Sequence, residues 1–192
     1  MTTQQWYSPT TTSQHAEFDQ HIQWQAGFTN SVDGQGRIVS TPNTDLSNRT
    51  GTIQSITPLL YISNDGHAPL RQKTWYITFT GFNITGLIDP INGIKVQTSI
   101  RRKGRILDET VQLTYQGNLM GENKINYQLD DLNHVPVHNS MTYGGPTDLW
   151  DNQLTSAMIQ DSSFGITLRL QSHLYYPHRE TVLIDSVQLM VY

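Results

Sequence analysis

Residues 142–150, TYGGPTDLW, are followed at residues 154–168 by LTSAMIQDSSFGITL, and this stretch decides how the rest of the chain is interpreted. It joins a Gly/Pro turn, a tryptophan, one helical turn and the start of a long strand. Thr155 is placed to cap the helical turn, so residues 157–159 are expected to pack over one end of the fold. We expect the Trp150 ring to fill that end and Asp148 to cap neighbouring amides.

The segments on both sides of this stretch show a two-residue periodicity. From Phe164 to Leu174 the apolar residues alternate, and residues 181–192 change phase near Asp185, which predicts a β-bulge. Residues 75–85 are predicted to form a half-buried strand, and residues 94–101 and 107–115 to pair as a hairpin with a basic tip. Residues 52–62, broken by Pro58, are typical of an edge strand or of a strand with a bulge, and a short strand is expected at 124–129.

Seven or eight strands at this spacing, with one short helical turn, predict an all-β fold. We expect an antiparallel β-sandwich of jelly-roll-like form over residues 51–192. The length of 192 residues suits one domain with an appendage. The chain has no cysteine, so packing and partners must stabilise it in place of disulfides or a cysteine zinc site.

Residues 1–50 are predicted to form an extended N-terminal arm. They are rich in Thr, Gln, Ser and Asn, and their apolar residues are too few and too irregular for a core of their own. The aromatic residues spaced along the arm are candidate partner-binding anchors: Trp6, Tyr7, Phe18, Trp24 and Phe28. We expect them to dock onto another chain or a symmetry mate, and the alternative is that the arm wraps its own domain.

The charge of the chain argues against nucleic acid as a partner. The formal net charge is −4, and charged residues make up only 15% of the sequence. The four basic residues at the predicted hairpin tip, residues 101–105, are more typical of a solvated turn or an ion pair with an acidic neighbour than of a phosphate-binding site. No run of about 18 apolar residues is present, so we expect no membrane-spanning helix, and the N-terminus lacks the features of a signal peptide.

The sequence offers little support for metal binding. His134 and His138 lie four residues apart, a spacing that suits a metal site on a helix. Pro136 between them favours an extended segment, in which the two imidazoles need not converge. We therefore expect no metal and no other cofactor.

Catalysis is also weakly supported. Asp148 and Asp151, on either side of Trp150, are the only pair of acids suggestive of glycoside cleavage, and no nucleophile elbow motif is present. We expect no catalytic residues and no enzymatic activity. An alternative use of this loop is that Tyr143, Asp148 and Trp150 bind a glycan, since aromatic rings in a Gly-rich loop can stack on sugars.

Four sequence segments together resemble a β-sandwich module of tailed-bacteriophage virion proteins: residues 143–150, the LTSAMI and SFGI segments that follow, and the C-terminal IDSVQLMVY. The resemblance covers about residues 75–192. One departure is Asp151, which stands where the family commonly has Gly after the Trp. The resemblance implies a virion structural protein without catalytic residues, such as a capsid decoration or cement protein, a neck component or a tail part.

We therefore expect a protein located in the virion, most simply a decoration or cement protein that stabilises the particle through its arm and sandwich. Its expected partners are other virion proteins such as the major capsid protein, and it is expected to form a homo-oligomer such as a trimer. The alternative is a tail or fibre component that binds a host-surface glycan. Neither hypothesis requires nucleic acid or a membrane.

Overall fold

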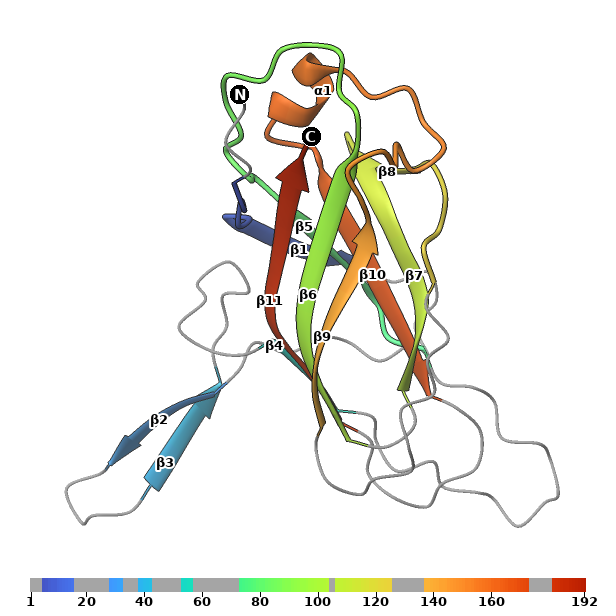
Figure 1. Ribbon diagram of the computed structural model, residues 1–192. Helices are drawn as coiled ribbons and strands as arrows, with labels where there is room; N and C mark the ends of the chain where they lie inside the picture. The colour runs from blue at the N-terminus through green and yellow to red at the C-terminus, as the bar shows by residue number, and fades with distance from the viewer. Residues whose placement is uncertain are drawn as a thin grey trace, which may run out of the picture.

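Two antiparallel sheets packed face to face form the body of the protein, as the computed structural model shows (Figure 1). The structure describes residues 5–15, 28–32, 38–42, 53–56, 73–103, 106–125, 137–172 and 181–192. One sheet has five strands in the order β1-β5-β10-β7-β8, and the other has four in the order β4-β11-β6-β9. The predicted fold class, an antiparallel β-sandwich, is confirmed.

The strands of the five-stranded sheet are β1 (Thr11–His15), β5 (Tyr76–Thr80), β7 (Ile106–Tyr115), β8 (Asn118–Met120) and β10 (Gly165–Ser172). The four-stranded sheet contains β4 (Ile53–Ile56), β6 (Ile94–Lys103), β9 (Val137–Gly144) and β11 (Thr181–Val191). A separate ribbon is made of β2 (Phe28–Val32) and β3 (Ile38–Pro42), and the helix α1 spans Ser156–Gln160.

The core lies between the two sheets and is built by alternation along each strand. Ile77 and Phe79 of β5 and Ile166 and Leu168 of β10 point inward from one sheet, and each is at most 1% exposed. Val96 of β6 and Leu189 of β11 are among the residues that meet them from the other sheet. This inward set follows the two-residue period of a strand that buries one face, as the sequence predicted for 75–85 and 164–174.

The predicted bulge and helix cap are both confirmed. The register between β11 and β6 shifts between Ile184 and Ser186, so Ile184 and Val187 are both buried although they differ in parity. The hydroxyl of Thr155 accepts a hydrogen bond from Met158 N at 3.2 Å, which caps α1. Within α1, Ile159 is the buried residue.

The predicted hairpin of residues 94–101 and 107–115 is wrong. β6 pairs with β11 and β9 in one sheet, whereas β7 pairs with β10 and β8 in the other. The chain therefore crosses from sheet to sheet between Lys103 and Ile106. Both arrangements bury one face of each strand, so the alternating pattern cannot distinguish two paired strands from two strands that face each other across a core.

The strand β9 was not predicted, because its residues were assigned to a turn and an extended loop. Along β9 the side chains of Met141 and Tyr143 are buried and those of Ser140 and Thr142 are exposed, as expected of a half-buried strand. The predicted edge strand at 52–62 is represented by β4, which lies at the edge of its sheet beside β11. Most of the predicted strand at 124–129 falls outside the described residues.

The first part of the predicted arm lies on the sandwich itself. Tyr7 exchanges two backbone hydrogen bonds with Leu189 of β11, at 2.8 and 2.9 Å, and its side chain packs against the core. Four residues later β1 pairs with β5 in the opposite sheet. Residues 5–15 thus join the two sheets along the side where β11 and β5 lie, so here the chain follows the alternative in which it wraps its own domain.

The β2–β3 ribbon stands apart from the two sheets (Figure 1). Its two strands pair with each other over five residues each, from Phe28 opposite Pro42 to Val32 opposite Ile38. Among the described residues, no other strand pairs with either of them. The predicted arm of residues 1–50 therefore contains a segment that is part of the sandwich and a segment that is not.

Gly165 at the start of β10 allows a close approach of β5, and this predicts a large effect of one added methyl group. A Cβ at Gly165 would overlap the carbonyl oxygen of Phe79, whereas a Cβ at Gly145 would meet nothing within 4 Å. We expect Gly165→Ala to lower the free energy of unfolding by about 3 kcal/mol, since a well-packed core cannot yield to the extra volume. Gly145→Ala is the matched control and should change it by less than about 0.5 kcal/mol. Equal values in denaturant titrations would contradict this packing.

Candidate functional site

The Trp150 ring fills a notch at one end of the sandwich. It is 0% exposed, and its indole Nε1 donates a hydrogen bond to the carbonyl oxygen of Ile94 at 3.0 Å. Two glycines allow Trp150 to sit this closely: a Cβ at Gly144 would lie 2.6 Å from the indole nitrogen, and a Cβ at Gly121 would overlap the backbone carbonyl oxygen of Trp150. The ring therefore fits beside Gly144, and the backbone of Trp150 beside Gly121, because these positions lack side chains. The prediction that Trp150 fills one end of the fold is confirmed.

Polar groups close the outside of this notch. Asp148 accepts a hydrogen bond from Trp150 N through Oδ1, at 2.8 Å, and its Oδ2 lies 3.0 Å from Lys124 Nζ. Lys124 also pairs with Glu122, whose backbone N donates to the Trp150 carbonyl oxygen at 2.7 Å. Partial burial works to lower the pKa of Lys124, but the hydrogen bonds to Glu122 and Asp148 outweigh it and raise the pKa.

The predicted glycan-binding residues come together, but two of the three are inside the fold. Tyr143 is only 4% exposed, and its hydroxyl donates a hydrogen bond to Asp108 Oδ2 at 2.8 Å. Neither the Tyr143 ring nor the Trp150 ring offers a face on which a sugar could stack. Asp148 is 31% exposed, with both of its carboxylate oxygens already engaged. In this structure the group seals the end of the sandwich.

The second acid of the sequence pair, Asp151, lies outside this arrangement. Asp151 is exposed and has a left-handed backbone conformation with φ of 51°, next to Trp150 with φ of 57°. It lines a shallow, open hollow together with Asn152 and Gln153. The two strained residues turn the chain sharply, which lets the Trp150 ring enter the notch while Asp151 faces solvent.

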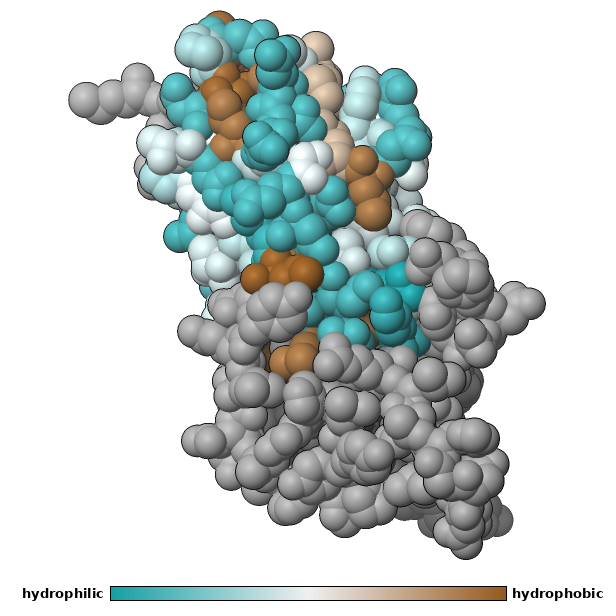
Figure 2. Space-filling model, turned by 90° about the vertical axis from the view of Figure 1, so that its right-hand side faces the viewer, coloured by the Kyte–Doolittle hydropathy of each residue, from teal (hydrophilic) through white to brown (hydrophobic). Residues whose placement is uncertain are grey.

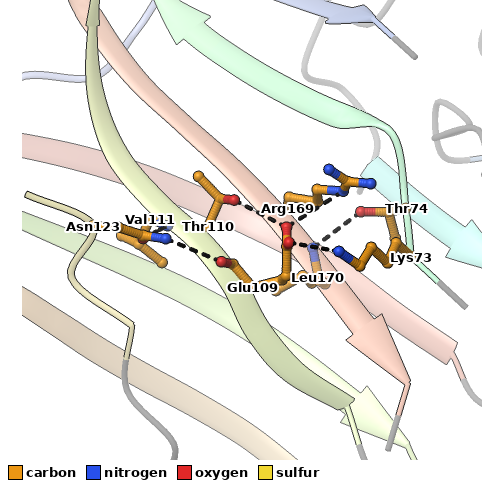
Figure 3. A network of polar contacts seen from close by, with 8 residues as sticks. All are labelled: Lys73, Thr74, Glu109, Thr110, Val111, Asn123, Arg169 and Leu170. Atoms are coloured by element: carbon orange, nitrogen blue, oxygen red, sulfur yellow. Dashed lines mark hydrogen bonds and ion pairs between the residues drawn. The ribbon is translucent and has the colours of Figure 1, made fainter. Parts of the chain in front are cut away.

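A second polar cluster, which the sequence did not reveal, lies on the five-stranded sheet (Figure 3). Glu109 is its centre, because its carboxylate pairs with Lys73 Nζ at 2.8 Å and lies 3.4 Å from Arg169 Nε. Arg169 is 1% exposed, and its guanidinium lies 4.5 Å from the centroid of the Tyr76 ring. The cluster joins β7, β10 and the residues just before β5 through charged side chains on neighbouring strands.

A β-bulge brings about this arrangement. Thr110 lies opposite Arg169 and Asp108 opposite Leu170, so Glu109 is an extra residue in β7. The bulge turns Asp108 inward to Tyr143 and leaves Glu109 on the side of Lys73 and Arg169. Simple alternation of residues 107–115 places these two acids the other way round, which explains why the sequence pattern did not indicate the cluster.

The predicted arm anchors have different positions. The Trp6 ring lies 5.6 Å from Lys95 Nζ in a cation–π contact, and Tyr7 is joined to β11 as described above. Phe28 is the first residue of β2 in the separate ribbon. Phe18 and Trp24 lie outside the described residues, as does His134 of the histidine pair. The structure therefore brings Trp6 and Tyr7 together on the sandwich and sets Phe28 on a different element.

The described residues contain neither a metal site nor a membrane-spanning helix. No three His, Cys, Asp or Glu side chains within these ranges are close enough together to hold a metal ion. In the same ranges, no helix has the length and apolar character needed to span a bilayer. The main polar groups found in the described part of the chain are thus the two clusters around Asp148 and Glu109.

Comparisons with known proteins identify no family. The chain matches no protein-family model and no curated protein. Among solved structures, it is similar to a chain described as the xylan-binding module CBM15, with a TM-score of 0.34 and 8% sequence identity, covering 95% of this chain and 97% of that chain. A likeness of this strength carries no argument about function.

The buried position of Trp150 predicts that replacing it lowers the stability of the fold. We expect Trp150→Ala to lower the free energy of unfolding by about 3–5 kcal/mol, since it empties a notch that the surrounding glycines cannot refill. Trp6→Ala removes an indole that contacts the protein surface through a cation–π pair, and should cost only about 1 kcal/mol. Circular dichroism during thermal unfolding measures both. A folded, equally stable Trp150→Ala protein that had lost adsorption to glycans would instead support a sugar-binding loop.

The cluster of Figure 3 predicts that its two ion pairs contribute unequally. Glu109→Gln removes the carboxylate shared by both ion pairs and leaves the buried Arg169 without it, so we expect a loss of free energy of unfolding near the lower end of about 3–5 kcal/mol, and the excess over Lys73→Met measures the Arg169 pair. Lys73→Met removes a side chain that is 35% exposed and should cost less than about 1 kcal/mol. Urea titrations of both variants measure the difference. A larger effect of Lys73→Met than of Glu109→Gln would contradict this assignment.

Proposed function

We propose that the protein is a non-enzymatic structural component of a bacteriophage virion, in which the sandwich sits on the particle and the β2–β3 ribbon docks onto a neighbouring chain. The most suitable role is that of a capsid decoration or cement protein, with the major capsid protein as a partner. The family resemblance of residues 75–192 motivates the virion role, and the ribbon supplies the means of attachment.

The observation that carries the proposal is the isolation of the ribbon. Within the described part of the chain, β2 and β3 pair only with each other. An isolated two-stranded ribbon is at best marginally stable in water. A sheet or groove on another chain would supply the missing contacts, so the ribbon is a natural docking element.

The composition of the ribbon indicates the kind of contact it makes. Neither FTNSV of β2 nor IVSTP of β3 contains a charged residue, and Phe28, Val32 and Ile38 are among the apolar ones. Binding would therefore depend on backbone hydrogen bonds and apolar burial. Because neither strand contains a charged residue, the affinity of a contact made through β2 and β3 should vary little with salt, unlike that of a charged arm.

In this proposal the sandwich acts as a rigid support for the ribbon. Residues 5–15 join both sheets on one side, and the Trp150 notch seals one end. A sandwich stabilised in this way can hold a ribbon without depending on it for its own fold. A glycan-binding tail component, the alternative function, would need a surface other than the buried rings of Tyr143 and Trp150.

Replacing residues 28–42 by a short Gly/Ser linker tests the proposal. We expect the variant to unfold at the same temperature as the full chain, since β2 and β3 pair with no described strand of the two sheets. Its occupancy on particles that lack the wild-type protein, measured by gel densitometry after sedimentation, should fall at least tenfold.

The matched control keeps the length and composition of residues 28–42 but scrambles their order. It should also fail to bind, because composition alone does not reproduce the strand pairing. Full occupancy of the linker variant on the particles would overturn the proposed role of the ribbon. A linker variant that fails to fold would show instead that the ribbon belongs to the sandwich.

A further inference from the structure

One long edge strand of the sandwich lacks the usual protection against pairing with another chain. β9 is the last strand of its sheet, and among the described residues only β6 pairs with it. It spans eight residues, compared with three in β8, four in β4 and five in β1, the other outer strands of the two sheets. Native proteins usually keep edge strands short or give them a Lys, a Pro or a bulge. β9 contains no charged residue and no Pro, and its register with β6 is unbroken.

The hydrogen-bond pattern shows which groups of β9 lie at this edge. Gly145 N donates to the carbonyl oxygen of Ile94, which sets the alternation of bonded and non-bonded pairs along the two strands. Tyr143 and Met141 then direct their backbone groups toward β6. Ser140 and Thr142 direct their N–H and C=O groups away from β6, and both of these residues are exposed. The edge thus presents a row of donors and acceptors suited to one more strand.

The β2–β3 ribbon also has edges that no described strand pairs with. Its outer edges present backbone groups that no described strand accepts, and of its two strands β2 contains no Pro whereas β3 ends at Pro42, which lacks an N–H. Both β2 and β9 are uncharged, so no like charges oppose their pairing. Within one molecule the ribbon and β9 lie on opposite sides of β11 and β6 (Figure 1).

We propose that the β2 edge of the ribbon in one copy pairs with the β9 edge in a second copy, extending the four-stranded sheet across the interface. This inference rests on the proposed function, in which the ribbon docks onto a neighbouring chain, and it names that chain as another copy of the protein. Donor and acceptor are different surfaces, so the contact is head-to-tail and closes into a ring when the rotation permits, as in a trimer.

The surface around β9 suits attachment through the backbone. In the side view of Figure 2, hydrophilic residues predominate over the described part of the molecule, and the hydrophobic areas are separate spots. A broad apolar patch is therefore not what attracts a partner on this side. Strand addition draws its affinity from main-chain hydrogen bonds and needs no such patch.

The absence of cysteine makes a direct test possible. Thr142→Cys places a thiol on the exposed face of β9, while Asn30→Cys and Ser31→Cys place thiols on the two opposite faces of β2. We expect a mixture of the Thr142→Cys protein with one of the two ribbon variants to form a disulfide-linked dimer on oxidation with copper phenanthroline. Non-reducing electrophoresis detects it. Thr85→Cys, an exposed residue before β6, is the matched control and should give at least tenfold less product.

Each outcome separates this inference from the proposed function. Linked dimers in the Thr142→Cys preparation alone would show that β9 pairs with itself, and would overturn the head-to-tail arrangement. No linked dimer in either mixture, together with loss of particle binding by the linker variant, would leave the ribbon docking on a different virion protein and overturn this inference alone. As a second measurement, Thr142→Lys should convert the oligomer to monomer in sedimentation equilibrium without lowering the unfolding temperature. An unchanged oligomer would also overturn the inference.

Discussion

The burial of the Trp150 ring in a notch without side chains is the constraint on which the rest of the structure depends. The ring contacts the start of β6 through the Ile94 carbonyl oxygen and the end of β9 at Gly144, while the backbone carbonyl of Trp150 approaches Gly121 after β8. β6 and β9 belong to one sheet and β8 to the other, so the ring and backbone of Trp150 together connect the two sheets at this end. Asp148 and Lys124 cover the notch with a hydrogen bond and an ion pair, which places polar groups outside and the ring inside.

Residues 5–15 close the side of the sandwich where β11 and β5 lie. Tyr7 extends the sheet of β11, and β1 extends the sheet of β5, so the first described segment of the chain is part of the fold. The β2–β3 ribbon comes next among the described residues and joins neither sheet. A protein whose two sheets form without this ribbon can use the ribbon for attachment. In the oligomer that we propose, the edge of β9 on another copy would accept it.

The sequence was sufficient for the fold class because each strand that buries one face repeats its apolar residues with a period of two. Ile77 with Phe79, and Ile166 with Leu168, follow this pattern and are buried as predicted. The change of phase near Asp185 and the Thr155 cap were also visible, since each depends on neighbouring residues alone. The buried position of Trp150 was predicted on a similar basis, because a large aromatic ring in a Gly-rich stretch usually supplies core burial.

What the sequence did not reveal depends on contacts between distant segments. The alternation of β6 and β7 is the same whether the strands pair or face each other, so the predicted hairpin was wrong. The bulge at Glu109 inverts the faces of two neighbouring acids, and only the register with Arg169 shows it. The sequence did not divide the predicted arm into two parts. Tyr7 contacts Leu189 and β1 contacts β5 across long stretches of sequence, and no local pattern indicates such contacts.

We propose that the β2–β3 ribbon depends on a partner whereas the sandwich does not. Amide hydrogen exchange, measured on the diluted monomer and on protein bound to the particle, tests it most directly. Amides of β1, β5 and β10 should be protected in both samples. Amides of β2 and β3 should exchange rapidly in the monomer and become at least tenfold slower in the particle. Slow exchange of the ribbon in the monomer, or equally fast exchange in the bound protein, would contradict the account.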